Sequence, residues 1–362
     1  PRHCSTRRPP GPGKLPFFRR QARPRMFSSG PILWLQQFSA PWFDALMRFI
    51  SWIGEPWFYI SAVLVLAFGV RLRPGLGVML AMLLVTFATE GFKQGFGLPR
   101  PSEVDARVLN EGERGHHLVA DGGAEGFWGL PSEAAIVAKR TVGEPSFGFV
   151  SGHTSAATAF ALALPLLFGM RKRWMWAVVV AWPLLMGLSR MALGRHFLAD
   201  VLGGLVVGAA CALAAGWLMR QMRAPRPAAR RTWAAALAAT GVAALAAWWL
   251  PWIDPGMAGQ VAGTLLAIGA LTHFGWPEEA APMGQRAGRA LLALGVGYAA
   301  IWLLETAYTA TGWPDRHAGA YFFAAAGIAA AVLATAALAR GLGLYRPPVQ
   351  AAAGADAGLR DR

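Results

Sequence analysis

The sequence predicts an all-α membrane protein, a polytopic bundle of about nine transmembrane helices preceded by an interfacial amphipathic helix. Of its 362 residues, 55% are hydrophobic and 15% are charged, and the mean hydropathy is +0.39. The apolar residues form long runs, several of which approach the roughly 20 residues that a helix needs to cross a bilayer. Short basic tracts separate these runs, as is typical of membrane topology.

The charge and cysteine content exclude other classes. A net charge of +15 would suggest nucleic acid for a soluble protein, but here the basic residues follow the apolar runs, so we expect membrane lipids and no nucleic acid as partners. Cys4 and Cys211 offer neither a disulfide framework nor metal-ligand spacing.

The two ends of the chain are expected to be disordered tails. Residues 1–25 are rich in Pro and Arg and cannot bury a core. Met26 begins a segment typical of an ordinary start, so we expect the preceding residues to belong to an upstream extension of the reading frame. A basic arm that binds anionic lipid is the alternative. Residues 341–362 form the second tail.

Residues 26–55 contain the predicted amphipathic helix. Between positions 32 and 53, polar residues recur every three or four positions against an apolar face, and four tryptophans cluster nearby. This pattern is typical of a helix that lies in the membrane interface rather than crossing the bilayer.

Residues 56–220 are predicted to form a five-span unit. Its spans are expected at about 57–70, 76–96, 153–168, 174–188 and 197–219. The connection over residues 98–150 holds eight acidic and five basic residues and is long enough to act as a lid.

Four further spans are predicted within residues 232–340. They are expected at about 233–250, 257–274, 290–309 and 319–338, and they are dominated by Ala, Gly and Leu. Small residues allow helices to approach closely in lipid, as does the pair Gly204 and Gly208 in the fifth span. This extension is therefore interpreted as a packing scaffold.

The chemistry is concentrated between Ser189 and Asp200, where four ionisable residues stand between two apolar runs. Ionisable residues at the edge of a span indicate a functional site. His196 and Asp200 are four residues apart, so on a helix the carboxylate can fix the imidazole tautomer and leave the other nitrogen free as a nucleophile. The alternative is a structural His–Asp pair that caps a helix.

Two upstream segments also fit a phosphate. Lys93 and Arg100 place two cations at the end of an apolar run, and Ser151, Gly152 and His153 open the next run. Arginine matches two phosphate oxygens, and free N–H groups at a helix start favour an anion.

With these three segments the chain resembles the type 2 phosphatidic acid phosphatase family. The family's signatures are Lys-x6-Arg-Pro, Pro-Ser-Gly-His and Ser-Arg-x5-His-x3-Asp, and their order and internal spacing match here. The resemblance covers about residues 32–220. One departure is Val150, which stands where the family usually has proline.

The resemblance implies a role for each matching residue. His196 attacks phosphorus and forms a phosphohistidine, Asp200 orients it, and His153 protonates the leaving oxygen. The remaining residues hold the phosphate oxygens, namely Lys93, Arg100, Ser151, Gly152 and Arg190. These fixed cations make a metal or other cofactor unnecessary.

Arg195 is an additional cation directly before His196. It points about 100° away from the nucleophile on a helix and cannot share the same phosphate oxygens. We expect it to contact the second phosphate of a diphosphate lipid. The alternative is that Arg195 reaches lipid headgroups or pairs with an acidic residue of the 98–150 connection.

These observations predict a phosphatase for a lipid phosphate or diphosphate, such as undecaprenyl diphosphate, phosphatidylglycerol phosphate or phosphatidic acid. The basic tracts orient the site toward the periplasm or exterior of a bacterial inner membrane. A phosphatase or phosphotransferase for a soluble sugar phosphate is one alternative, because nine spans are also similar to glucose-6-phosphatase. A transporter or scaffold is the other.

Overall fold

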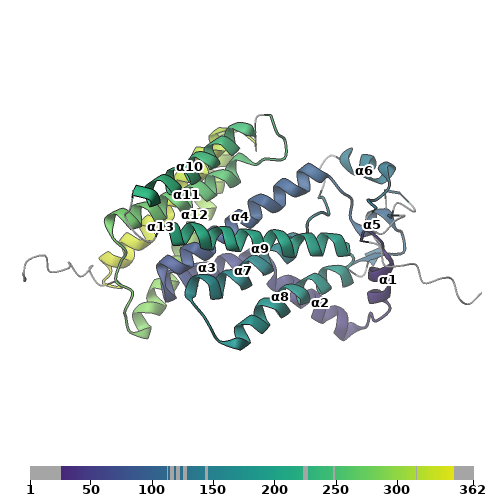
Figure 1. Ribbon diagram of the computed structural model, residues 1–362, viewed down its shortest axis with the longest axis horizontal. Helices are drawn as coiled ribbons and strands as arrows, with labels where there is room; N and C mark the ends of the chain where they lie inside the picture. The colour runs from purple at the N-terminus through teal and green to yellow at the C-terminus, as the bar shows by residue number, and fades with distance from the viewer. Residues whose placement is uncertain are drawn as a thin grey trace, which may run out of the picture.

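The computed structural model describes residues 26–111, 113–114, 118–119, 123–124, 129–142, 146–222, 227–247, 249–314 and 316–345. The described residues are mostly helical, and Figure 1 shows their arrangement. The expected tails at residues 1–25 and 341–362 lie outside this description except for residues 341–345, so those predictions stay open.

The N-terminal region differs from its prediction. The single helix expected over residues 32–53 is wrong, because the structure has α1 (Gly30–Gln36) and α2 (Pro41–Ile53). Pro41 occupies the first turn of α2, where its missing N–H costs no hydrogen bond. Next come α3 (Pro56–Leu64) and a π-helical turn, η1 (Val65–Val70).

These N-terminal helices form a bent pair. Residues 41–53 and 56–70 together are long and apolar enough to cross a membrane, with a bend of 49° between them. Such a pair is a broken span or a re-entrant segment, so α2 is continuous with the membrane part of the protein rather than separate from it.

The next helices match the predicted spans of the five-span unit closely. They are α4 (Leu72–Phe96), α7 (Gly152–Phe168), α8 (Arg173–Ala192) and α9 (Leu198–Gln221). The four predicted C-terminal spans correspond to α10 (Pro227–Ala246), α11 (Pro255–Phe274), α12 (Met283–Ala310) and α13 (Gly319–Gly341).

The chain is an integral membrane protein. Six helices within the described residues are long and apolar enough to cross a membrane, or seven if the bent pair is one span. Two shorter apolar helices, 152–168 and 233–246, fall below that length. The predicted count of about nine spans is therefore not confirmed, although a helix lies at every predicted position.

The connection over residues 98–150 contains secondary structure of its own. It includes α5 (Pro101–Val104), the antiparallel strands β1 (Leu109–Asn110) and β2 (Glu113–Arg114), and α6 (Glu133–Arg140). Buried Lys139 of α6 pairs with Glu103 of α5. These elements cluster with α1 at one end of the molecule (Figure 1).

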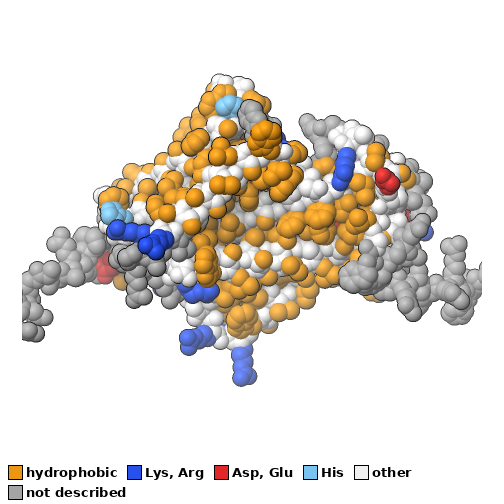
Figure 2. Space-filling model, turned by 45° about the horizontal axis from the view of Figure 1, so that its top comes forward, with side chains coloured by type: hydrophobic (Ala, Val, Ile, Leu, Met, Phe, Trp, Pro, Cys, Tyr) orange, Lys and Arg blue, Asp and Glu red, His pale blue; other side chains and the backbone are white. Residues whose placement is uncertain are grey.

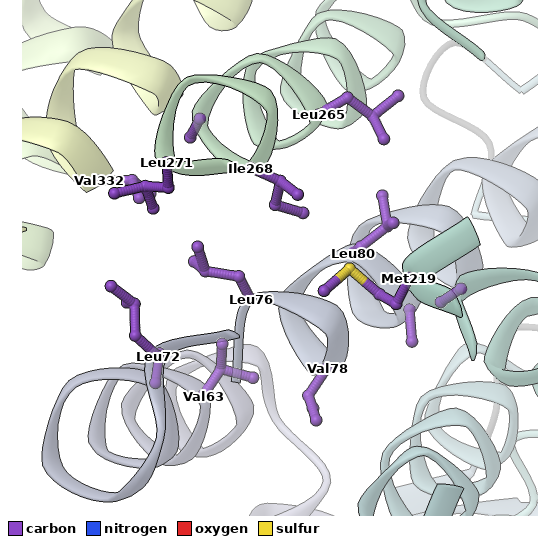
Figure 3. Close-up of a cluster of buried hydrophobic side chains, with 14 of the residues drawn as sticks. Val63, Leu72, Leu76, Val78, Leu80, Met219, Leu265, Ile268, Leu271 and Val332 are labelled. Carbon is purple, nitrogen blue, oxygen red and sulfur yellow. The ribbon is translucent and has the colours of Figure 1, made fainter. Parts of the chain in front are cut away.

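The largest core joins the catalytic and C-terminal halves. Side chains of α4 face those of α11 and α13, with Met219 of α9 beside them (Figure 3). Leu76 and Leu80 of α4 and Leu265 and Ile268 of α11 are almost wholly buried. The C-terminal extension and the five-span unit therefore share one core.

Helices α7 and α9 cross closely at two glycines. A Cβ atom on Gly204 would lie 2.8 Å from the backbone oxygen of Ser151, and one on Gly208 would lie 2.4 Å from that of Ser155. The predicted close contact at this glycine pair is confirmed. It brings the first turns of α7 and α9 together at the end of the bundle that holds the candidate site.

The outer surface suits lipid. Hydrophobic side chains cover much of the face shown in Figure 2, and most of the Lys and Arg side chains visible there lie toward its lower and left margins. Large exposed residues include Trp174 and Val180 of α8, Val206 of α9 and Trp302 of α12. Exposed apolar surface of this extent is expected where helices contact lipid chains.

Candidate active site

His196 and Asp200 form a buried pair. His196 lies in the turn between α8 and α9, and its Nδ1 is 3.3 Å from Oδ2 of Asp200 in the first turn of α9. Both side chains are at most 3% exposed. Since the carboxylate accepts the proton on Nδ1, Nε2 of His196 is the nitrogen that carries no proton in the neutral ring.

Asp200 also holds the backbone around it. Its Oδ2 accepts the N–H of Phe197 at 2.8 Å, which caps the start of α9, and its backbone oxygen accepts the N–H of Ser151 at 2.9 Å. The helix-capping role considered as an alternative for Asp200 is therefore present together with the contact to His196. Asp200 thus connects the third predicted motif, to which it belongs, to Ser151 of the second motif.

His153 lies in the first turn of α7. Its Nε2 is 3.3 Å from Oε1 of Glu55, a residue between α2 and α3. Gly54 makes this approach possible, because a Cβ atom there would lie 2.7 Å from Cδ2 of His153. The connection between α2 and α3 thus fixes the position of the predicted general acid.

The start of α7 faces Lys93. Ser151 is the N-cap residue, and its hydroxyl accepts hydrogen bonds from the N–H and the hydroxyl of Thr154. A Cβ atom on Gly152 would lie 3.7 Å from Nζ of Lys93. An ammonium group and the free N–H groups of a helix start therefore point to the same small space, an arrangement that favours a phosphate.

Arg190 is a buried cation with spare donors. It lies near the end of α8 with 4% exposure, and its Nη1 donates to the hydroxyl of Ser51 in α2. Its Nε has no hydrogen-bond partner among the described residues, and neither has Oδ1 of Asp200. Buried groups of this kind are normally satisfied, so a ligand that accepts from Arg190 would complete the site.

Arg100 is held in place by Ser146. Its Nε donates to the backbone oxygen of Ser146 at 3.0 Å, and its Nη2 donates to the hydroxyl of Ser146 at 2.7 Å. Its backbone N–H is bonded to Glu103. Ser146 thereby ties the first motif to the segment that leads into α7.

The electrostatics of His196 reflect these neighbours. Burial lowers the pKa of the imidazole well below its usual value, and the positive charges of Arg100, Arg190 and Lys93 lower that pKa further. Cations from the first and third motifs therefore act on the same ring. A neutral imidazole is the form that can attack a phosphate.

Arg195 pairs with an acidic residue. Its Nε lies 2.9 Å from Oε1 of Glu111, in the turn between β1 and β2. Glu111 is fixed there, because its backbone oxygen accepts from Arg48 and its N–H bonds to Leu193. This is the ion pair that was the alternative to a second-phosphate contact, and the latter stays a prediction.

Sequence reasoning missed four residues that support the site. Glu55, Ser51, Gly54 and Ser146 lie outside the three motifs, and the contacts they make span 46 residues or more of sequence. Ser51 and Glu55 do stand out as polar residues in an apolar region, and that signal could have identified them.

No metal-binding group was predicted. Among the residues that the structure describes, no group of three or more His, Cys, Asp or Glu side chains is arranged to hold a metal ion. His116 and His117, neighbours in the 98–150 connection, lie outside the described residues.

The fold and the site define a membrane-embedded helical protein in which histidines and cations gather around the starts of α7 and α9. Residues 74–227 match the PAP2 superfamily, and these residues hold all three predicted motifs. The resemblance to the type 2 phosphatidic acid phosphatase family is therefore confirmed over this part of the chain.

Two relatives are similar over parts of the chain. A lipid A 4'-phosphatase of Bacteroides thetaiotaomicron is 38% identical over 72 residues, which is 20% of this chain and 29% of that protein. A crystal structure of LpxE from Aquifex aeolicus superposes with a TM-score of 0.39 and 20% identity, covering 51% of this chain and 92% of that one. The chain thus matches less than a third of the length of the curated relative.

Proposed function

We propose that this protein is a phosphatase that removes the terminal phosphate of a lipid phosphate or lipid diphosphate. The observation that carries the proposal is the meeting of two histidines and the buried cation Arg190 at one end of the α7–α9 crossing. His196 has an oriented imidazole, His153 begins the facing helix, and Arg190 has an unpartnered nitrogen.

The first chemical step transfers phosphorus to nitrogen. Nε2 of His196 attacks in line, the bond between phosphorus and the lipid oxygen breaks, and the leaving oxygen takes a proton from His153. Lys93, Arg100, Arg190 and the N–H groups at the start of α7 neutralise the three equatorial oxygens, where phosphoryl transfer needs positive charge. We expect no metal ion to be required.

The second step releases phosphate. Water attacks phosphorus, the bond between phosphorus and Nε2 of His196 breaks, and His153 accepts a proton from that water, which restores both histidines to their starting forms. Asp200 stabilises the positive charge that develops on the imidazole of His196 in the first step. That charge disappears in the second step. Inorganic phosphate is the product of each turnover.

A lipid substrate is supported by two observations. The reactive groups lie at the ends of apolar helices, and the similar protein from Bacteroides is named for lipid A, a phosphorylated lipid. Phosphatidic acid, phosphatidylglycerol phosphate, undecaprenyl diphosphate and lipid A phosphates all present the same terminal group. We propose the lipid class and leave the individual lipid to experiment.

The site is proposed to face the periplasm or cell exterior. His153 stands at the start of α7, while Arg171, Lys172 and Arg173 follow its end at Phe168, which lies about 22 Å from His153 along the helix. Basic residues favour the cytoplasmic side, so His153 lies on the other side.

The test is phosphate release by the purified protein. We expect turnover of lipid phosphates, little turnover of glucose 6-phosphate, and a loss of at least about a thousandfold for His196→Ala. A radiolabelled terminal phosphate should give an acid-labile phosphoprotein with the parent and none with His196→Ala. Phosphate release by that variant within tenfold of the parent would remove His196 as nucleophile.

A further inference from the structure

An apolar chamber opens onto the candidate active site. Its volume is about 550 Å³, within the range of roughly 300–1,000 Å³ that ligand sites occupy. Lys93, Gly152 and His153 line one end of it. The chamber and the phosphate groups are therefore parts of one continuous space.

One wall of the chamber is a single face of α4. Met79, Met82, Leu83, Thr86 and Glu90 line it at the spacing of neighbouring helical turns, ending at Lys93. The 14 residue steps from Met79 to Lys93 correspond to about 21 Å. Half of a bilayer's hydrocarbon core measures about 15 Å, so the chamber is deeper than one leaflet.

The opposite wall belongs to the C-terminal extension, outside the residues that match the superfamily. Gly297, Ala300, Ile301 and Leu304 of α12 line it, together with residues of α13 such as Ala331 and Val332. These helices are tightly packed, since a Cβ atom on Gly327 of α13 would lie 2.4 Å from Cδ2 of Leu304. Val332 also belongs to the core shown in Figure 3, which anchors this wall to α4.

We propose that the chamber binds one hydrocarbon chain of the lipid phosphate, and that α12 and α13 set which chains fit. The inference rests on the proposed function for the identity of the phosphate end. A single occupant meets both chemical demands: a phosphate at Lys93 and His153, and an apolar chain along α4. A soluble sugar phosphate would leave the apolar walls unused.

The chamber contributes selectivity rather than affinity. A chain that leaves the bilayer for an apolar chamber exchanges one hydrocarbon surrounding for another, so there is little hydrophobic gain. What differs between substrates is how well their hydrocarbon chains fit the rigid wall of the chamber. The helices α12 and α13 therefore do more than pack against the rest of the bundle. They distinguish substrates by the shape of the hydrocarbon chain.

Photolabelling tests the location without requiring turnover. The probe is phosphatidic acid with a diazirine near the end of one acyl chain, bound to full-length His196→Ala in nanodiscs. We expect labels on chamber residues of α12 and α13, reduced by excess unlabelled phosphatidic acid. Labels confined to lipid-facing residues such as Trp302, or labels that the competitor does not reduce, would overturn the proposal.

A pair of neighbouring substitutions tests the selectivity. Ala331→Phe fills the chamber, whereas Ala330→Phe adds the same ring to the exposed side of α13. We expect Ala331→Phe to lower kcat/KM for dioleoyl phosphatidic acid by about tenfold or more while changing the dihexanoyl form by about twofold or less. Ala330→Phe should change neither, and equal losses on both substrates would contradict the inference.

The outcomes separate the two proposals. If the parent releases phosphate from lipids but the label misses α12 and α13, the chamber proposal fails and the proposed function stands. If the label enters the chamber but no lipid phosphate is hydrolysed, the proposed function fails and the chamber proposal stands. Should Ala331→Phe fail to fold, the photolabel pattern of His196→Ala decides, because that protein has an unaltered chamber.

Discussion

Oε1 of Glu55 lies 3.3 Å from Nε2 of His153, so a carboxylate outside the matched superfamily region contacts the proposed general acid. Glu55 is a positioning residue, because its carboxylate can hold the proton of His153 on Nε2. Glu55→Gln keeps the size of the side chain and removes its charge.

For Glu55→Gln we expect kcat/KM to fall about tenfold on a lipid alkoxide and less on an aryl phosphate, whose leaving group needs little protonation. The basic limb of the pH profile should move to lower pH, because a carboxylate stabilises protonated His153. Asp44→Asn is the control, because Asp44 is a half-buried carboxylate of α2 that contacts Ser39 instead of His153. An unchanged pH profile, with equal losses on both substrates, would reduce Glu55 to a structural role.

The pH dependence of His196 gives a second prediction. Burial and three cations lower its pKa, so the folded protein keeps the ring neutral below the usual value of about 6.5. The acidic limb of kcat/KM should therefore lie below pH ~6.5. Substrates whose phosphates have different pKa values show whether this limb belongs to the enzyme. A limb set by His196 stays at the same pH for all of them, whereas a limb set by the substrate moves.

The same shift affects stability. Below pH ~6.5 the unfolded chain binds a proton at this histidine and the folded protein does not, so the free energy of unfolding falls as the pH decreases. His196→Asn should show a weaker dependence over that range in thermal unfolding. The same slope in both proteins would indicate that His196 is not buried in its neutral form.

Metal removal and vanadate address the reaction itself. We expect phosphate release to persist in EDTA, because fixed cations surround the phosphate. Vanadate should inhibit, since a trigonal-bipyramidal anion on His196 resembles the transition state. Activity that is lost on chelation and restored by Mg²⁺ or Zn²⁺ would contradict the proposed mechanism.

Arg195 can be tested against its ion pair with Glu111. A contact to a second phosphate predicts that Arg195→Ala costs a polyprenyl diphosphate about 1.5–3 kcal/mol in transition-state binding and spares the monophosphate. An ion pair alone predicts that both substrates lose activity by the same small factor, and that Glu111→Gln has a similar effect. Comparing kcat/KM for the two substrates decides between these roles.

Gly208 tests the crossing that assembles the site. A Cβ atom there would lie 2.4 Å from the backbone oxygen of Ser155, so Gly208→Ala should separate α7 from α9 and destabilise the protein by about 1–3 kcal/mol. Gly216→Ala, where the nearest atom is 3.9 Å away, is the control. Thermal unfolding in detergent measures both, and equal stability would show that α7 can shift at no cost.

The sequence predicted the helices of the bundle well because each apolar run has the length of a helix. Its motifs predicted residues that the structure brings together, since His196 lies just before α9 and Asp200 lies in the first turn of that helix. Contacts across the bundle could not be predicted this way. His153 and Glu55 are 98 residues apart, and Arg190 and Ser51 are 139 apart, so only packing reveals them.

The differences have physical reasons. The predicted helix over residues 32–53 ignored Pro41, which starts a helix more readily than it continues one. The ion pair of Arg195 depends on the turn between β1 and β2, which a polar sequence does not specify. The chamber depends on two helices whose composition indicates only that they pack closely.

The shared core has a consequence for how the protein is made. Residues 72–96 are synthesised before residues 255–274, so if α4 enters the membrane during synthesis, the face that later meets α11 first contacts lipid. In water an uncovered row of leucines would invite aggregation, but in a bilayer lipid chains solvate it at little cost. When the C-terminal helices dock later, they replace the lipid chains on this face of α4. Only a membrane keeps the uncovered face from aggregating until then.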